Sequence, residues 1–290
     1  MKTPIASHIY KQGEGYENTL DVYLPDQPTT PLACVLYIHG GWLLWGTRKN
    51  VVQSEIEVIT EAGMAYVAVD YRLAPETKVM EIAKDIQDAL AWVRGEGARL
   101  YHFDPDRVAV SGKSAGGYLA MLSGTFERRP KAIVAYYGYS SLIGEWTTVP
   151  TPGYETQPPL TLDDVYHGAE PGVPTFGERD DRHMLYEYAM QTGRYLELAT
   201  GYAQPNAEVE KYCPILNIDA QYPPTLLLHG TADAGVSVVE SSRMHTALQG
   251  AGVNSTLRTV RDAGHGFDSA WGNLPREFGL VASFLKEQLG

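Results

Sequence analysis

The segment Gly112-Lys113-Ser114-Ala115-Gly116-Gly117 places a serine between small residues. The segment follows an apolar run expected to form a strand and precedes a run expected to form a helix. In that context a sharp strand-to-helix turn exposes the serine hydroxyl, and the small residues on either side relieve crowding. The helix N-terminus also favours developing negative charge. We therefore predict that Ser114 is a nucleophile for acyl transfer.

An activated serine needs a general base and an orienting acid downstream in the sequence. His265 lies in the segment Asp262-Ala263-Gly264-His265-Gly266-Phe267, and Asp233 lies in His229-Gly230-Thr231-Ala232-Asp233. Both residues come directly after expected strands, at the edge where open α/β sheets build their sites. The sequence therefore predicts His265 as the base and Asp233 as the acid.

Three other residues compete for these roles. Asp262 is the second choice for the acid, but a residue so near His265 in sequence is badly placed to face its imidazole Nδ1. We expect His229 to cap a strand end. We expect His39 to brace the loop that contains it rather than to act as the base.

The segment His39-Gly40-Gly41-Trp42 directly follows another apolar run. Acyl transfer needs backbone N–H groups directed at the developing oxyanion, and adjacent glycines allow the chain to approach closely. We predict an oxyanion hole formed by the amides of Gly41, Trp42 and Ala115.

The elements that must position these residues follow from hydrophobic periodicity. Strands are expected at residues 19–24, 33–38, 65–70, 107–111, 132–137, 225–228 and 255–260. Helices are expected at residues 51–62, 79–94, 115–126, 238–249 and 278–289. Apolar strands that alternate with helices indicate a mostly parallel sheet with right-handed crossovers, so the fold class is α/β. We expect one domain over residues 1–290.

An insertion at about residues 142–212 interrupts this alternation and contains a helical piece near residues 182–198. Its position between two sheet strands is typical of a cap over the site. Its aromatic residues favour an aromatic or flat apolar substrate through stacking, although each one singly is expected to pack the cap onto the body. They are Trp146, Tyr154, Tyr166, Phe176, Tyr186, Tyr188, Tyr195, Tyr202 and Tyr212.

Composition excludes several classes of function. The net charge of −12 argues against nucleic-acid and anionic-membrane binding, since both require basic patches. No signal peptide or membrane span is evident, so a cytoplasmic protein is expected. We expect Cys34 and Cys213 to be buried free thiols. The chemistry requires neither a metal nor an organic cofactor.

Two charged positions allow more than one interpretation. Lys113 could attract an anionic substrate, but we favour its pairing with a nearby carboxylate. The segment Asp70-Tyr71-Arg72-Leu73-Ala74-Pro75-Glu76 is interpreted as a turn held by an internal ion pair rather than as a substrate contact.

Together these motifs resemble the hormone-sensitive-lipase-like and feruloyl-esterase-like carboxylesterase branch of the α/β hydrolases. The resemblance rests on residues 39–42, 70–76 and 112–117 and on the loops of Asp233 and His265. It implies an α/β-hydrolase fold with a cap, and it favours a homodimer. The chain departs from the branch at two positions. Trp42 stands where a third glycine is usual, and Lys113 stands where the branch often has an acidic residue. The motif is closer to the His-Gly-Gly-x-Trp pattern of arylformamidase-like members, although this chain has Leu43 at the position where they carry tryptophan.

The expected function is cleavage of a small carboxylic ester, a small-molecule substrate, by a Ser-His-Asp acyl-enzyme mechanism. The alternatives are an arylformamidase-type amide hydrolase, a biosynthetic acyltransferase or cyclase, and a non-catalytic ligand receptor on the same fold. A peptidase of the prolyl-oligopeptidase type is disfavoured, because that group commonly carries a large N-terminal propeller and 290 residues leave no room for one.

Overall fold

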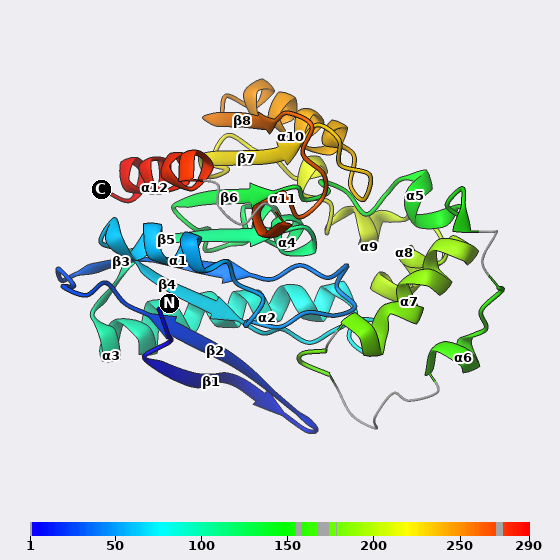
Figure 1. The fold of residues 1–290 in the computed structure, drawn as a ribbon, viewed down its shortest axis with the longest axis horizontal. Coiled ribbons are helices and arrows are strands. Elements are labelled where there is room, and N and C mark those ends of the chain that lie inside the picture. Colours follow the sequence, from blue (N-terminus) through cyan, green and yellow to red (C-terminus); the bar gives the residue numbers. More distant parts are fainter. Residues whose placement is uncertain (1, 155–157, 167–173, 178, 271–274) are drawn as a thin grey trace.

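The computed structural model describes residues 2–154, 158–166, 174–177, 179–270 and 275–290 (Figure 1). Its strands form one sheet in the order β1-β2-β4-β3-β5-β6-β7-β8. Pairing is antiparallel between β1 and β2 and between β2 and β4, and it is parallel between all other neighbours. The strands are β1 (Ala6–Gly13), β2 (Tyr16–Tyr23), β3 (Leu32–Ile38), β4 (Ala65–Val69), β5 (Phe103–Lys113), β6 (Ala132–Tyr136), β7 (Thr225–Gly230) and β8 (Ser255–Val260). The mostly parallel α/β sheet predicted from the sequence is confirmed.

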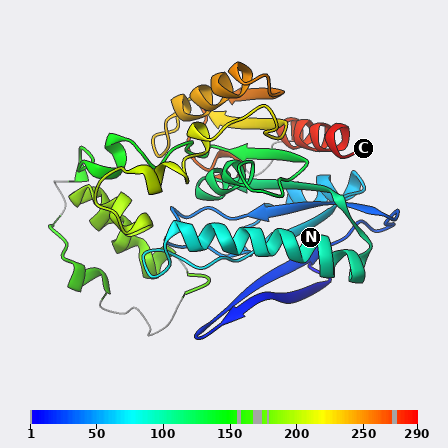
Figure 2. The same ribbon diagram turned by 180° about the vertical axis from the view of Figure 1, so that it is seen from behind.

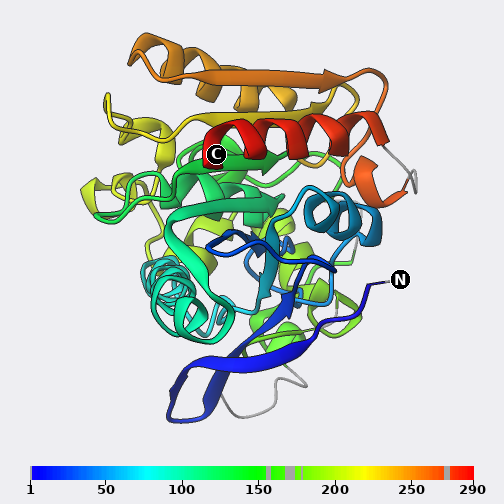
Figure 3. The same cartoon turned by 90° about the vertical axis from the view of Figure 1, so that its left-hand side faces the viewer.

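Helices cover both faces of this sheet. The helices of the body are α1 (Gln53–Glu61), α2 (Val79–Trp92), α3 (Ala98–Tyr101), α4 (Ala115–Ser123), α10 (Val238–Gly250), α11 (Phe267–Ala270) and α12 (Pro275–Leu289), with a π-helical turn η1 (Val93–Gly97) between α2 and α3. Figure 3 shows α1 and α2 on opposite sides of the sheet, and α2 crosses in front of the strands in Figure 2. The core therefore has two layers: α1 and α12 pack on one face, and α2, α4 and α10 pack on the other.

The inner strands are apolar along their whole length because both of their faces are covered. All seven residues of β3 and all five of β4 and of β6 are buried. Such continuous apolar runs are typical of parallel strands covered on both sides. This pattern makes the expected strands easy to recognise in the sequence. Because the strands pair in parallel, their carboxyl ends lie at one edge of the sheet.

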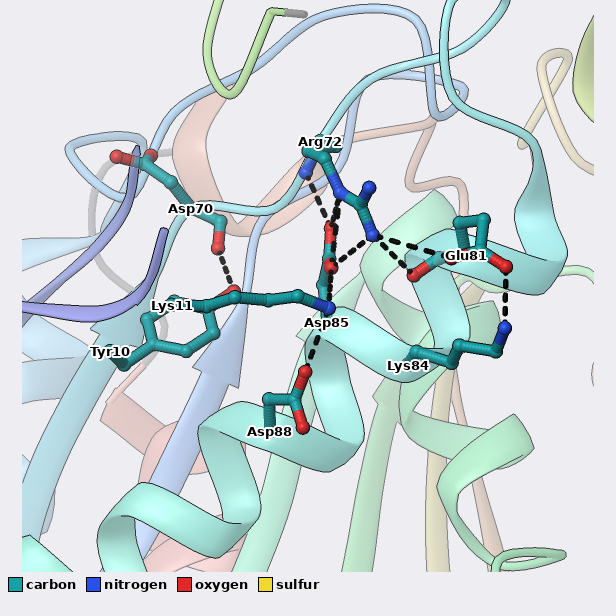
Figure 4. A network of polar contacts seen from close by, with 8 residues as sticks. All are labelled: Tyr10, Lys11, Asp70, Arg72, Glu81, Lys84, Asp85 and Asp88. Atoms are coloured by element: carbon teal, nitrogen blue, oxygen red, sulfur yellow. Dashed lines mark hydrogen bonds and ion pairs between the residues drawn. The ribbon is translucent and has the colours of Figure 1, made fainter. Parts of the chain in front are cut away.

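The β1–β2 hairpin is fastened to α2 by a polar network (Figure 4). The Lys11 ammonium lies 2.7 Å from carboxylate oxygens of both Asp85 and Asp88 on α2. The Tyr10 hydroxyl donates to the carbonyl oxygen of Asp70 at 2.6 Å, and the Arg72 guanidinium lies 2.7 Å from Asp85. Because these contacts join side chains that are distant in the sequence, hydrophobic periodicity does not predict them.

The segment 70–76 is not held by an internal ion pair, so that prediction was wrong. The Asp70 carboxylate pairs with Arg48, and Arg72 pairs with Asp85. Glu76 lies 2.6 Å from the Arg182 guanidinium of the insertion. Each charged side chain of the segment therefore pairs with a different part of the chain: the loop before α1, the helix α2 or the insertion.

The insertion lies between β6 and β7 and beyond the ends of the strands (Figure 1). Its described helices are α5 (Glu145–Thr148), α6 (Leu162–Tyr166), α7 (Arg179–Thr192), α8 (Tyr195–Thr200) and α9 (Ala207–Glu210), with the short 3-10 helix η3 (Pro214–Leu216) following. The predicted helical piece 182–198 is therefore two helices. Gly193, with a φ of 65°, ends α7, because the left-handed conformation stops a helix.

Candidate active site

Ser114 occupies a sharp turn between β5 and α4. Its φ of 55° and ψ of −120° lie in a region that non-glycine residues rarely adopt. Its amide donates to the carbonyl oxygen of Tyr136 at 2.9 Å. A β-carbon added at Gly112 would lie 2.1 Å from the Gly116 carbonyl oxygen, so the turn can be this tight only with glycine there. The glycine spacing thus accounts for the backbone that presents the Ser114 hydroxyl.

His265 joins Ser114 to Asp233 by hydrogen bonds. Its Nε2 lies 3.0 Å from the Ser114 Oγ, and its Nδ1 lies 2.8 Å from Asp233 Oδ2. Because a carboxylate only accepts, the Nδ1–H donates to Asp233, which leaves Nε2 to accept the Ser114 proton. The structure thus brings the three predicted residues together, although Ser114 lies over a hundred residues before the other two in the sequence.

The Asp233 carboxylate is fully buried and richly hydrogen-bonded. Its Oδ1 accepts from the amides of Gly235 and Val236, both at 2.8 Å. Burial alone would raise the pKa of Asp233, but hydrogen bonds from His229, His265 and the Val236 amide outweigh it and hold the pKa well below its ordinary value. Asp233 is therefore ionised wherever the imidazole needs an acceptor.

The competing residues lie elsewhere or in supporting positions. The Asp262 side chain is 83% exposed and lies beside Arg261, away from the imidazole. His229 is buried, with Nδ1 2.7 Å from Ser241 Oγ and Nε2 3.3 Å from Asp233 Oδ2. His229 therefore lies at the end of β7, as expected. It also contacts the Asp233 carboxylate, which the sequence analysis did not anticipate.

His39 is buried beneath the adjoining turn. Its ring stacks on Tyr71 with centroids 4.3 Å apart, and its Nδ1–H donates to the Gly40 carbonyl oxygen at 2.7 Å. Burial lowers the pKa of His39. These contacts agree with the bracing role expected for it.

The turn at Gly41 and Trp42 packs directly on the nucleophile turn. A β-carbon added at Gly40 would lie 3.1 Å from the Ser114 β-carbon. Gly41 and Trp42 have φ values of 114° and 57°. Their carbonyl oxygens are engaged elsewhere, since Leu44 and Trp45 donate to Gly41 and the Tyr195 hydroxyl donates to Trp42. The peptide planes of this turn are therefore fixed.

Ala115 is the first residue of α4, so its amide has no acceptor within the helix. The predicted trio of amides at Gly41, Trp42 and Ala115 thus borders Ser114 from two sides. Their role as an oxyanion hole stays a prediction.

Two adjoining cavities open at the site. The larger measures about 590 Å³ and is lined by Ser114 and His265 together with Trp45, Tyr137 and the insertion residue His183. The smaller measures about 340 Å³, and five of its twelve lining residues are aromatic. Trp42, Tyr154, Tyr186 and Gly235 border both cavities. A substrate at Ser114 therefore has an aromatic compartment beside it.

The aromatic residues of the insertion divide between the cavities and the core. Trp146, Tyr154 and Tyr186 line the cavities. Tyr188 and Tyr195 are buried in the core. The Phe176 side chain is 61% exposed, and the Tyr166 side chain lies outside the described part of the structure. Only a part of the aromatic set is thus available to a substrate.

Lys113 pairs with carboxylates, as the sequence analysis favoured. Its Nζ lies 2.7 Å from Glu55 Oε2 and 2.6 Å from Asp268 Oδ2. Both partners are buried and come from α1 and α11. Neither was identified from the sequence, where they resemble ordinary helix residues. The charge of Lys113 is thus balanced by two carboxylates of the protein, at a position that also borders the larger cavity.

The described ranges contain no cluster of three or more His, Cys, Asp or Glu side chains placed to hold a metal ion. Cys34 and Cys213 are free and buried. None of the described helices is long and apolar enough to cross a membrane.

Two family models match successive parts of the chain. The family described as BD-FAE matches residues 20–144, which include Ser114, and the prolyl oligopeptidase family matches residues 153–290, which include Asp233 and His265. Curated relatives include the non-reducing polyketide synthases ausA of Aspergillus calidoustus and trt4 of Aspergillus terreus. Each is 30% identical, over 92% and 90% of this chain respectively. The chain spans 13% of the length of either relative.

Solved structures resemble the whole chain. A Staphylococcus aureus protein of unknown function has a TM-score of 0.79 at 20% identity and covers 98% of this chain and 100% of its own. The acetyl ester-xyloside bifunctional hydrolase from Caldicellulosiruptor lactoaceticus has a TM-score of 0.72 at 19% identity, with 99% and 97% covered. Esterase Est2 from Thermogutta terrifontis has a TM-score of 0.64 at 22% identity, with 97% and 90% covered. The chain thus has the α/β-hydrolase fold.

Proposed function

We propose that this protein is a serine hydrolase that cleaves a small carboxylic ester through an acyl-enzyme intermediate on Ser114. The observation that carries the proposal is the continuous hydrogen-bonded chain from Ser114 through His265 to Asp233. Its geometry is that of a nucleophile, a base and an orienting acid. The strained backbone of Ser114 supports the same interpretation, because strain of this kind is concentrated at functional sites.

In the first step His265 Nε2 removes the Ser114 proton while Oγ attacks the ester carbonyl carbon. Asp233 holds the Nδ1–H and stabilises the imidazolium that forms. The amides of Gly41, Trp42 and Ala115 stabilise the negative charge on the carbonyl oxygen. The imidazolium then protonates the leaving alcohol, and the acyl group remains on Ser114.

In the second step His265 removes a proton from water, and the resulting nucleophile attacks the acyl-enzyme carbonyl. The same amides stabilise the second tetrahedral intermediate. Its collapse releases the carboxylic acid and returns the proton to Ser114 Oγ. Apart from the water and the substrate, these steps use only side chains and amides of this chain.

The smaller cavity supports an aromatic or flat apolar group in the substrate. Trp42, Tyr139, Trp146, Tyr154 and Tyr186 border it. Trp42 and Tyr139 stack with centroids 6.1 Å apart, so the wall is pre-formed rather than assembled around the ligand. Burying an aromatic ring against such a wall is favourable through both area and ring geometry.

The variant Trp146→Ala tests this preference. We expect it to lower kcat/KM for an aromatic ester relative to an aliphatic one by about fivefold, since an aromatic pair contributes about 1 kcal/mol beyond its buried area. Two pairs of esters locate the ring: p-nitrophenyl benzoate against p-nitrophenyl acetate, and 2-naphthyl acetate against ethyl acetate. Exposed Phe176 provides the control variant Phe176→Ala. The preference is wrong if neither ratio changes, or if both variants change it equally.

The curated relatives support a second candidate. Their names describe polyketide synthases, which build acyl chains, and 30% identity extends over nine tenths of this chain. The same acyl-enzyme on Ser114 could be formed from a thioester and resolved by an alcohol, an amine or a nucleophile within the acyl chain. That activity would make the protein an acyltransferase or a cyclase rather than an esterase.

Product analysis separates the two candidates. The protein would be incubated with the N-acetylcysteamine thioester of an aromatic acid, with and without a small alcohol as acceptor. Free acid as the main product in both mixtures supports hydrolysis. A transferred ester formed at a higher rate than the acid, and absent with Ser114→Ala, supports acyl transfer.

A further inference from the structure

A buried ion pair lies directly beside the nucleophile. Lys113 is the residue before Ser114, and its Nζ lies 2.6 Å from Asp268 Oδ2. The side chain of Lys113 is 7% exposed and that of Asp268 is fully buried. Pairs of this kind rarely add net stability over a well-packed apolar substitute, because the charges lose their hydration. The position of the pair therefore calls for another explanation.

Asp268 lies in α11, which directly follows the His265 loop, three residues further along the chain than His265. The ion pair therefore links the segment that carries the nucleophile to the segment that carries the base. Between these two segments lies the 3.0 Å contact from Ser114 Oγ to His265 Nε2, on which proton transfer depends.

Tyr137 connects the ion pair to the imidazole ring. Its hydroxyl donates to Asp268 Oδ1, so the carboxylate is held by both Lys113 and Tyr137. Its ring meets the His265 ring edge-on, with centroids 4.7 Å apart and an interplanar angle of 63°. Tyr137 has a φ of 38°, and its amide donates to the Leu228 carbonyl oxygen at 2.7 Å. The backbone thus aims this ring at the imidazole.

Lys113 keeps its charge in this buried setting. Burial alone would lower the pKa of its ammonium, but the carboxylates of Glu55 and Asp268 raise it above its ordinary value. Glu55 belongs to α1 and also accepts from the Tyr136 hydroxyl at 3.0 Å. Glu55 therefore shares the charge of Lys113 from an element that carries neither the nucleophile nor the base.

We propose that Lys113, Tyr137 and Asp268 form a positioning brace that holds the His265 imidazole in line with Ser114. The brace rests on the proposed function, in which His265 takes the Ser114 proton. None of its three residues needs to touch the reacting atoms. Their effect is on how often the imidazole is aligned for proton transfer, so the brace governs kcat rather than substrate binding.

The test compares two variants that each remove one carboxylate from Lys113. Asp268→Asn breaks the link to the base, whereas Glu55→Gln leaves that link in place. Steady-state hydrolysis of p-nitrophenyl acetate gives kcat and KM, and thermal unfolding gives Tm. Asp268→Asn is expected to lower kcat by about 10²-fold, because a displacement of about 1 Å has that effect, with KM within about threefold. Glu55→Gln is expected to lower Tm by about as much as Asp268→Asn does, but to lower kcat by less than about threefold.

Tyr137→Phe serves if Asp268→Asn does not fold. It keeps the ring against His265 and removes only the hydroxyl that anchors it to Asp268. Its kcat should fall by about tenfold, between the wild type and Asp268→Asn, with an unchanged KM. A kcat unchanged in every folded variant, or lowered equally by Glu55→Gln and Asp268→Asn, overturns the brace.

Labelling with a fluorophosphonate separates failure of the brace from failure of the proposed function. A wild type that neither turns over the ester nor becomes labelled at Ser114 rejects the nucleophile and the brace with it. A labelled, active wild type with unaffected brace variants rejects the brace alone. Labelling that slows in Asp268→Asn but not in Glu55→Gln supports both proposals.

Discussion

Replacing Ser114 with alanine is expected to reduce ester turnover by about 10⁴-fold or more, because the step that forms the acyl-enzyme loses its nucleophile. Hydrolysis of p-nitrophenyl acetate, butyrate and octanoate provides the measurement. In the wild type, the dependence on chain length also gives the size of the acyl site. Ser114 packs in a turn whose shape depends on the neighbouring glycines, so alanine should fit without loss of fold.

The control for this variant is a measurement of its folding. Far-ultraviolet circular dichroism and Tm should match the wild type within a few degrees. An unaltered rate of ester turnover in a folded Ser114→Ala protein would remove the acyl-enzyme from the account. A loss of activity accompanied by a loss of fold would call for Ser114→Gly in its place.

Replacing Asp233 with asparagine is expected to lower kcat by about 10⁴-fold, the size of effect seen when an orienting aspartate becomes an amide in a serine protease. The physical reason is the tautomer. The asparagine amide can donate to Nδ1, which moves the imidazole proton to Nε2 and leaves no acceptor for the Ser114 hydroxyl. The measurement is kcat with p-nitrophenyl acetate across pH 6 to 9.

Asp262 offers a matched control, because it lies in the loop of His265 and was the alternative acid in the sequence. Its side chain is 83% exposed, so Asp262→Asn should change kcat by less than about twofold. Equal losses of kcat in the two variants, or a larger loss in Asp262→Asn, would contradict the assignment of Asp233 as the acid.

The sequence predicts the residues of this site well because their signals are local. The turn that contains Ser114 requires the glycines around it, and Gly266 beside His265 has a φ of 69°. Apolar runs mark the strands before both residues. Parallel strands bring their carboxyl ends to one edge, so Ser114, Asp233 and His265 could be expected to meet there. The structure brings them into contact, while their catalytic roles stay predictions.

The supporting residues could not be found in the same way. Glu55 and Asp268 look like ordinary charged helix residues, and only the fold shows that both are buried against Lys113. The contact of His229 with Asp233 depends on side-chain packing at the end of β7, which hydrophobic periodicity does not encode. The strand β1 also escaped prediction, since its half-buried and exposed residues give a weak pattern at a sheet edge.

The most direct test of the central account is to trap the acyl-enzyme. The wild type is mixed with p-nitrophenyl butyrate, quenched in acid within the first turnovers, digested and analysed by mass spectrometry. The account predicts a butyryl group on the peptide that contains Ser114, and its absence from Ser114→Ala. A butyryl group on a different residue, or turnover of the ester with no adduct at any time, would contradict it.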